Sequence, residues 1–156
     1  MEPIGKSPIT VALLITGKIA MLFCWLFVLT KTSNILTMHY DSQTTQWIGI
    51  ALYAFGIVIV IFGFIGLGSS VSVGLPEEKT VLKTEGIYRF SRNPMYLGGF
   101  VICLGSCLYS IHIINVILFA ITFAIHHNIV LKEEIFLEKR FGNSWLEYKE
   151  KVHRYI

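Results

Sequence analysis

Three apolar stretches, separated by polar segments, account for about half of the chain. Two of them, residues 9–29 and 47–67, are runs in which Lys18 is the one charged side chain. About 20 apolar residues in a helix cross the hydrocarbon core of a bilayer, which is roughly 30 Å thick. The pattern therefore predicts two membrane-spanning helices in the first half of the protein.

A third apolar stretch is too long for a single span. Residues 94–131 are 38 residues without a Lys, Arg, Asp or Glu. As one helix they would extend about 57 Å, nearly twice the thickness of the hydrocarbon core. We expect a helical hairpin instead, with spans at residues 94–110 and 113–131. Its turn should fall in the polar cluster that runs from Ser110 through His112 to Asn115.

Two polar segments, residues 68–93 and 132–156, flank this hairpin and must therefore meet at the same face. Asn93 and Pro94 are suited to be the N-cap and the first-turn proline of the third span. The fourth helix is expected to continue past the bilayer to Phe141, where Gly142 ends it.

A last, amphipathic helix is predicted near the C-terminus. The segment from Ser144 to Glu147 has the spacing of a capping box at a helix start. Trp145, Tyr148 and Val152 then fall along one face of this helix. We expect it to lie on the membrane surface or beneath the bundle.

Composition agrees with a chain embedded in lipid. The sequence is 54% hydrophobic and 15% charged, with a mean hydropathy of +0.64, which lies outside the range of ordinary soluble domains. The expected fold is therefore a single all-α domain over residues 1–156, a bundle of about four transmembrane helices with a cofactor pocket at its polar end. Cys24, Cys103 and Cys107 all lie in apolar runs and are predicted to be packing residues.

Charge placement predicts the orientation of the spans. Eleven of the thirteen Lys and Arg residues lie before residue 9, between residues 68 and 93, or after residue 131. With four spans these segments share one side, which the positive-inside rule assigns to the cytoplasm. We expect a multi-pass cell-membrane protein with both termini cytoplasmic. The start of the chain has no small-residue cleavage site, so no removable signal peptide is predicted.

Two linked motifs carry a resemblance to a known family. The first is Gly-Ile-Tyr at residues 86–88, followed by Arg-Asn-Pro-Met-Tyr-Leu-Gly at residues 92–98. The second is His126, then the Glu133-Glu134 pair, with Leu, Phe-Gly and Tyr at residues 137, 141–142 and 148. Over residues 75–156 this order resembles the isoprenylcysteine carboxyl methyltransferase and phospholipid methyltransferase family.

The resemblance implies a helical membrane bundle whose cytoplasmic end binds S-adenosylmethionine while a hydrophobic or lipid acceptor enters from the bilayer. Membrane lipids are then expected as partners, and nucleic acid is not. The resemblance points to candidate catalytic residues His126, Arg92 and Glu134 and to candidate cofactor contacts Leu82, Gly86, Tyr88, Asn93, Pro94, Tyr96 and Glu133. No metal site is predicted.

Several of these residues also have a structural interpretation. One alternative is that Arg92 and Arg89 are simply positive-inside anchors. Another is that Asn93-Pro94 is simply the start of a helix. Because Glu133 and Glu134 lie about 100° apart on a helix, at most one should face the cofactor. The other is expected to be solvated or paired with a lysine.

The sequence departs from the isoprenylcysteine enzymes in two places. Asn93 stands where they carry His, and residues 126–132 hold no Arg ahead of the Glu pair to grip a substrate carboxylate. An unpaired charge in such a site would be costly. We therefore expect a neutral or cationic acceptor, with His126 as the base for an amine.

Two other functions share parts of this pattern. A membrane reductase of the sterol-reductase kind has a similar bundle but binds a nicotinamide cofactor, whose phosphates call for more cations than the four in residues 68–93. A non-enzymatic membrane subunit would leave the two motifs unexplained. The methyltransferase is the function that uses both motifs.

Overall fold

A computed structural model describes residues 11–33, 35–36, 42–68 and 81–156. Within these residues every regular element is a helix, which confirms the all-α class. The elements are α1 (Val11–Leu26), α2 (Val28–Thr32), α3 (Gln43–Leu67), the short 3-10 helix η2 (Gly86–Arg89), α4 (Pro94–Tyr109), α5 (Ile113–Phe141) and α6 (Asn143–Lys151).

Three helical stretches are long and apolar enough to cross a membrane: Ala12–Thr32, Gln43–Leu67 and Ile113–Phe141. The fourth apolar helix, α4, has 16 residues and a length of about 24 Å. The first stretch consists of α1 and α2, which Phe27 separates. The chain is thus an integral membrane helical bundle, in which one apolar helix is shorter than the three candidate spans.

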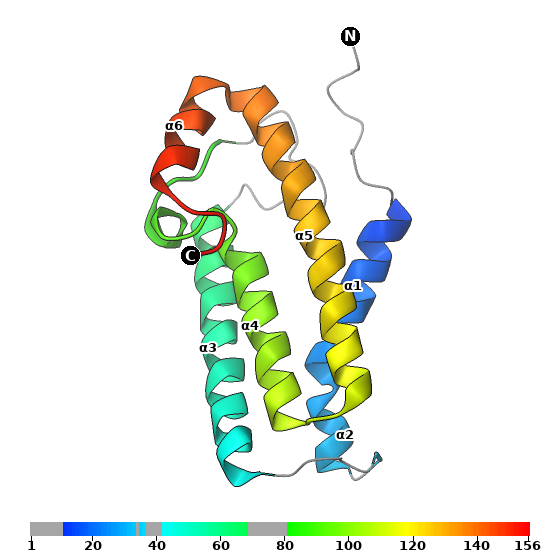
Figure 1. Ribbon diagram of the computed structural model, residues 1–156. Coiled ribbons are helices and arrows are strands. Elements are labelled where there is room, and N and C mark those ends of the chain that lie inside the picture. The colour runs from blue at the N-terminus through cyan, green and yellow to red at the C-terminus, as the bar shows by residue number, and fades with distance from the viewer. Residues whose placement is uncertain (1–10, 34, 37–41, 69–80) are drawn as a thin grey trace.

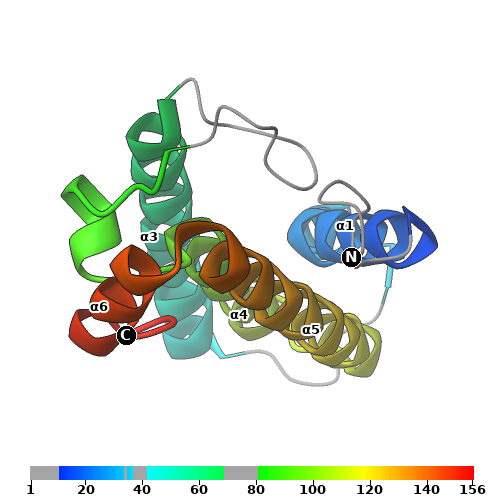
Figure 2. The same cartoon turned by 90° about the horizontal axis from the view of Figure 1, so that it is seen from above.

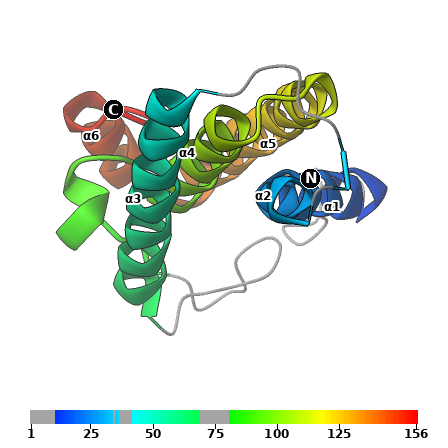
Figure 3. The same ribbon diagram turned by 90° about the horizontal axis from the view of Figure 1, so that it is seen from below.

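The four apolar helices stand side by side, as Figure 1 shows. In the end views, α4 and α5 lie between α3 on one side and α1 on the other (Figures 2 and 3). The predicted hairpin joins α4 to α5, with Ser110–His112 between the helices and His112 accepting a hydrogen bond from the Ile114 amide at 3.2 Å. The hairpin is therefore present, although Asn115 lies inside α5 rather than in the turn.

Glycine allows α3 and α4 to approach each other closely. Gly49, Gly56 and Gly63 recur every seven residues on α3 and are buried against α4. A Cβ added at Gly56 would lie 2.8 Å from the Gly98 carbonyl oxygen, and one added at Gly105 would lie 2.5 Å from the Tyr53 amide nitrogen. Small residues at such spacing are a common basis for helix association in lipid, where apolar burial gives no driving force.

The three cysteines are buried in one apolar cluster toward the hairpin end, as expected. Cys24 donates to the Asn115 side-chain oxygen at 3.3 Å, and Asn115 donates to the Ser106 hydroxyl at 3.1 Å. Ser106 in turn donates to the Cys24 carbonyl at 2.6 Å. These bonds satisfy buried polar groups, so the cluster fixes α1, α4 and α5 to one another.

At the opposite end, α5 continues to Phe141 and the chain turns at Gly142, whose φ is +53°. The final helix forms as predicted, but the prediction of a capping box at its start was wrong. Gly142 occupies the N-cap position, α6 begins at Asn143, and Ser144 lies within the helix. Gly142 already reverses the chain and Asn143 begins the helix, so Ser144, two residues after the glycine, cannot be a separate cap.

The apolar face of α6 packs inward as its pattern indicates. Trp145, Tyr148 and Val152 are buried together, with Leu82, Leu137 and Phe141 against them. The helix thus folds against the end of α5, and residues 152–156 return toward the start of α4 (Figure 1).

Candidate functional site

Glu134 lies at the centre of a buried ionic network where α4 begins. Its side chain is 6% exposed and binds two guanidinium groups, one through each carboxylate oxygen. Arg92 donates to Oε1 through Nη2 at 3.0 Å and Nε at 3.2 Å. Arg154 donates to Oε2 through Nη2 at 2.9 Å and Nε at 3.1 Å. Each guanidinium thus donates two charge-assisted hydrogen bonds to one carboxylate oxygen, and such bonds are stronger than those between neutral groups.

Arg92 also binds the C-terminal segment directly. Its Nη1 donates to the carbonyls of Lys149, at 3.1 Å, and Val152. Its backbone amide donates to the His153 carbonyl at 3.0 Å. With its side chain only 6% exposed, Arg92 is a buried cross-link between the start of α4, the end of α5 and the tail.

Asn93 joins the same network. Its amide group donates to Glu134 Oε1 and to the Arg154 carbonyl, each at 3.3 Å. It occupies the N-cap position of α4 with no capping bond from its side chain, and Pro94 follows at the first helical position. The polar side chain that the sequence suggested as a cap therefore serves the network instead.

These contacts determine how the network titrates. Hydrogen bonding to Glu134 raises the pKa of Arg154 above its already high value, so the guanidinium stays charged. A buried carboxylate with two cations and an amide donor has its lone pairs occupied. The arrangement therefore holds the backbone in place and leaves Glu134 little capacity to bind anything else.

The second glutamate belongs to a different cluster. Glu133 accepts a hydrogen bond from the Tyr96 hydroxyl at 3.0 Å, and the Tyr96 ring lies 5.8 Å from that of His126. His126 is buried, and its Nδ1 lies 2.9 Å from the Thr122 carbonyl oxygen. In the described part of the chain, no cation lies within 4.0 Å of Glu133. Of the two glutamates, Glu133 is thus the one whose carboxylate oxygens can still accept hydrogen bonds from a ligand.

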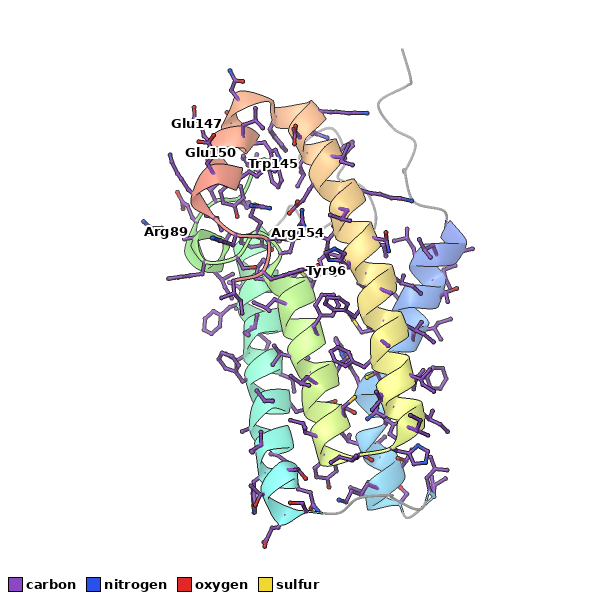
Figure 4. The ribbon with its side chains drawn as sticks, viewed as in Figure 1. Arg89, Tyr96, Trp145, Glu147, Glu150 and Arg154 are labelled. Carbon is purple, nitrogen blue, oxygen red and sulfur yellow. The ribbon has the colours of Figure 1, made fainter. Side chains whose placement is uncertain are left out.

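Figure 4 shows the side chains at this end of the bundle. Tyr96, Trp145 and Arg154 point inward, between α4, α5 and α6, whereas Arg89, Glu147 and Glu150 point away from the bundle. Arg89 is exposed, which fits the anchoring interpretation better than a ligand contact.

Of the other predicted cofactor contacts, Tyr88 and Leu82 are packed within the fold. The buried Tyr88 donates to the Gly63 carbonyl at 3.2 Å, and Tyr148 donates to the Tyr88 carbonyl at 2.7 Å. Burial raises the pKa of Tyr148 to about 12, so this donor stays protonated. Leu82 packs against the α6 cluster, and Gly86 is exposed with a φ of +61°.

An open cavity of about 400 Å³ lies beside α6. It does not contain the residues that the motifs single out as cofactor contacts or catalytic groups. Its lining consists of Thr84, Arg89, Ser144, Glu147, Tyr148, Lys151 and Val152. We therefore place the candidate site on the inner side of this end of the bundle rather than in this cavity.

Sequence reasoning missed the contribution of the last residues of the chain. Arg154 completes the Glu134 network, and the Tyr155 hydroxyl lies 3.1 Å from Nδ1 of His127. The Tyr155 ring also packs edge-on against Phe100, with centroids 5.7 Å apart. A signal was available, since an Arg-Tyr pair lies shortly after the end of an amphipathic helix, but its partners are 20 or more residues away.

Comparison with known proteins identifies the class. The phospholipid methyltransferase family model matches residues 44–144, more than half of the chain. The chain therefore belongs to the phospholipid methyltransferase family. No solved structure matches it significantly.

Its curated relatives are protein-S-isoprenylcysteine O-methyltransferases. The Dictyostelium discoideum protein is 30% identical over 110 residues, which cover 68% of this chain and 46% of the relative. The Arabidopsis thaliana enzyme A is 27% identical, covering 95% of this chain and 78% of the relative. A probable enzyme of the same name from Oryza sativa subsp. indica is 25% identical over 96% of this chain and 81% of its own. The chain thus spans about half the length of the first relative and most of the plant ones.

Proposed function

We propose that this membrane methyltransferase transfers a methyl group from S-adenosylmethionine to a lipid-borne or hydrophobic acceptor at the cytoplasmic membrane face. The proposal rests on the different hydrogen-bonding environments of the two adjacent glutamates. Glu134 is fully engaged by Arg92 and Arg154, whereas Glu133 sits beside Tyr96 with bonding capacity left. The network thus builds a rigid frame around one available carboxylate.

The residues present fit S-adenosylmethionine. When bound, it supplies a methyl group on a sulfonium, together with an ammonium and an adenine that need a carboxylate and an apolar or aromatic surface. Glu133 is the carboxylate for the ammonium, and Tyr96 fixes its orientation at 3.0 Å. Phe100 and Tyr155, whose ring centroids are 5.7 Å apart, offer the aromatic surface. Asn93 and Pro94 hold the neighbouring backbone in position.

His126 is arranged as a proton acceptor for an acceptor group that must lose a proton. A carbonyl oxygen accepts hydrogen bonds, so the 2.9 Å contact with Thr122 assigns the proton to Nδ1. Nε2 then carries the free lone pair. A neutral imidazole in this tautomer can take a proton from an ammonium or a hydroxyl group.

The alternatives are less well supported. Membership of the phospholipid methyltransferase family favours methyl transfer over reduction by a nicotinamide cofactor. A purely structural subunit would not require a carboxylate with free capacity beside a histidine inside a membrane bundle, where polar groups are costly.

The proposal is tested by incubating the purified protein with methyl-labelled S-adenosylmethionine and three acceptors: an aminophospholipid, a long-chain amine and a farnesylated cysteine. Label should appear in at least one of them. His126→Ala should slow transfer to the amine most, whereas His153→Ala, at an exposed position, should leave it unchanged. Absence of transfer to all three by folded protein would refute the proposal.

A further inference from the structure

A lysine of the first span lies next to the Glu133 cluster. Gly17 of α1 faces α5 so closely that an added Cβ would lie 2.7 Å from Ile125 and 3.2 Å from Cε1 of His126. Lys18, the next residue, is near enough to act electrostatically on both His126 and Glu133. The sequence had left this lysine without a role.

The direction of the helix favours the approach of Lys18 to this cluster. Side chains on a helix tilt toward its N-terminus, and α1 runs antiparallel to α5 (Figure 1). We therefore expect the four-carbon stem of Lys18 to extend toward the polar end of α5, where Glu133 lies. A lysine within a span is expected to extend in this way.

Lys18 also borders a lipid-facing surface. Ile15, Ile19 and Leu22, at helical spacing along the same side of α1, are between 48% and 52% exposed. An acyl or prenyl chain lying along these residues would bring its headgroup to the level of the Lys18 ammonium. Charge complementarity then selects what that headgroup carries.

We propose that Lys18 binds an anionic oxygen group of the acceptor lipid, a carboxylate or a phosphate, and so positions the acceptor beside Tyr96, His126 and Glu133. This inference rests on the proposed methyl transfer and specifies its acceptor. It replaces the expectation of a neutral or cationic acceptor, which considered only the cations immediately ahead of the glutamate pair. The missing cation of α5 is supplied here from α1.

The test compares wild type, Lys18→Gln and Lys18→Arg in the methyl-transfer assay. The acceptors are a farnesylated cysteine with a free carboxylate, an aminophospholipid and a long-chain amine without an anionic group. Lys18→Gln should raise KM at least about tenfold for whichever anionic acceptor is used, with KM for the simple amine and affinity for S-adenosylhomocysteine unchanged. Lys18→Arg should restore KM.

The matched control is Lys31→Gln, at the other end of the same span, where the lysine donates to the Tyr109 carbonyl. It should not change KM. An equal rise in KM for the simple amine and the anionic acceptors, or no rise for any, would overturn the role of Lys18 and restore the earlier expectation.

A second measurement applies even if no acceptor is methylated. Native mass spectrometry of protein purified with a mixture of anionic and neutral lipids should show the anionic ones retained by wild type and Lys18→Arg and lost from Lys18→Gln. Equal retention by all three overturns the inference. If lipid retention depends on Lys18 but the protein does not bind S-adenosylhomocysteine, the role of Lys18 stands and the proposed methyl transfer is wrong.

Discussion

Two adjacent glutamates at the end of α5 have different environments because successive helix positions differ by about 100°. Glu134 faces the start of α4 and the tail, whereas Glu133 faces Tyr96. The helical spacing predicted that the two carboxylates would face different surroundings, but the expectation that the second glutamate, Glu134, is solvated or paired with a lysine was wrong. Its partners are Arg92 and Arg154, and Arg154 reaches it only through tertiary folding.

Glu134→Gln should strongly destabilise the protein. The substitution leaves Arg92, with 6% of its side chain exposed, without a counter-charge, and breaking a buried pair in this way typically costs about 3–5 kcal/mol. The free energy of unfolding in detergent measures the effect. Glu138→Gln is the control, because the Glu138–Lys149 pair is 45% and 42% exposed and should be worth less than about 1 kcal/mol. Similar losses for both variants would contradict a central role for Glu134.

At the scale of elements, the pairing of α3 with α4 depends on glycines rather than on large apolar side chains. Gly56 and Gly98 face each other, and a Cβ on either would meet the other's carbonyl oxygen at 2.8 Å. Backbone atoms cannot move aside as a flexible side chain does. The seven-residue glycine spacing was visible in the sequence, yet apolar composition alone predicts spans without showing which ones touch.

Gly56→Leu should therefore separate α3 from α4. Overpacking commonly costs about 1–3 kcal/mol, and contact with backbone on both sides favours the upper end of that range. Ala54→Leu is the matched control, since Ala54 is exposed on another face of the same helix. Thermal unfolding of the two purified variants makes the comparison. A Gly56→Leu protein as stable as the control would show that these helices do not pack through the glycines.

The C-terminal segment is the other element whose contribution the structure reveals. Deleting residues 154–156 removes the Arg154–Glu134 pair and the Tyr155–His127 contact. We expect faster amide hydrogen exchange in the last turns of α5 and weaker binding of S-adenosylhomocysteine. Deleting Ile156 alone, which is 91% exposed, should change neither. Unaltered exchange in the longer deletion would mean that the segment is not part of the site.

At the scale of the whole molecule, hydrophobic patterning was sufficient for the helical class and the hairpin. Lipid makes long apolar runs helical because every backbone polar group must be satisfied within the segment. Patterning was not sufficient for the site, since the Arg92–Glu134–Arg154 network joins three distant segments and Lys18, which we propose to bind the acceptor, lies on a fourth. The motifs named most members of the site, but only the fold separates supporting residues from available ones.

The orientation of the molecule is open to a direct test by cysteine labelling. Because the three native cysteines are buried, a cysteine placed at the exposed position Ser144 or Thr44 reports separately on each end of the bundle. We expect a membrane-impermeant thiol reagent to label the Thr44→Cys protein in intact cells, and the Ser144→Cys protein only after permeabilisation, because the cations gather at the latter end. The reverse pattern would invert the topology.

We propose that Glu133 and its surroundings hold S-adenosylmethionine. Calorimetric titration of the purified protein with S-adenosylhomocysteine tests it most directly. The wild-type protein should bind saturably, and Glu133→Gln should bind at least about tenfold more weakly, because a lost charge-assisted hydrogen bond costs about 1.5–3 kcal/mol, while its unfolding transition stays unchanged. Folded wild-type protein that does not bind S-adenosylhomocysteine, or that binds a nicotinamide dinucleotide instead, would contradict the account.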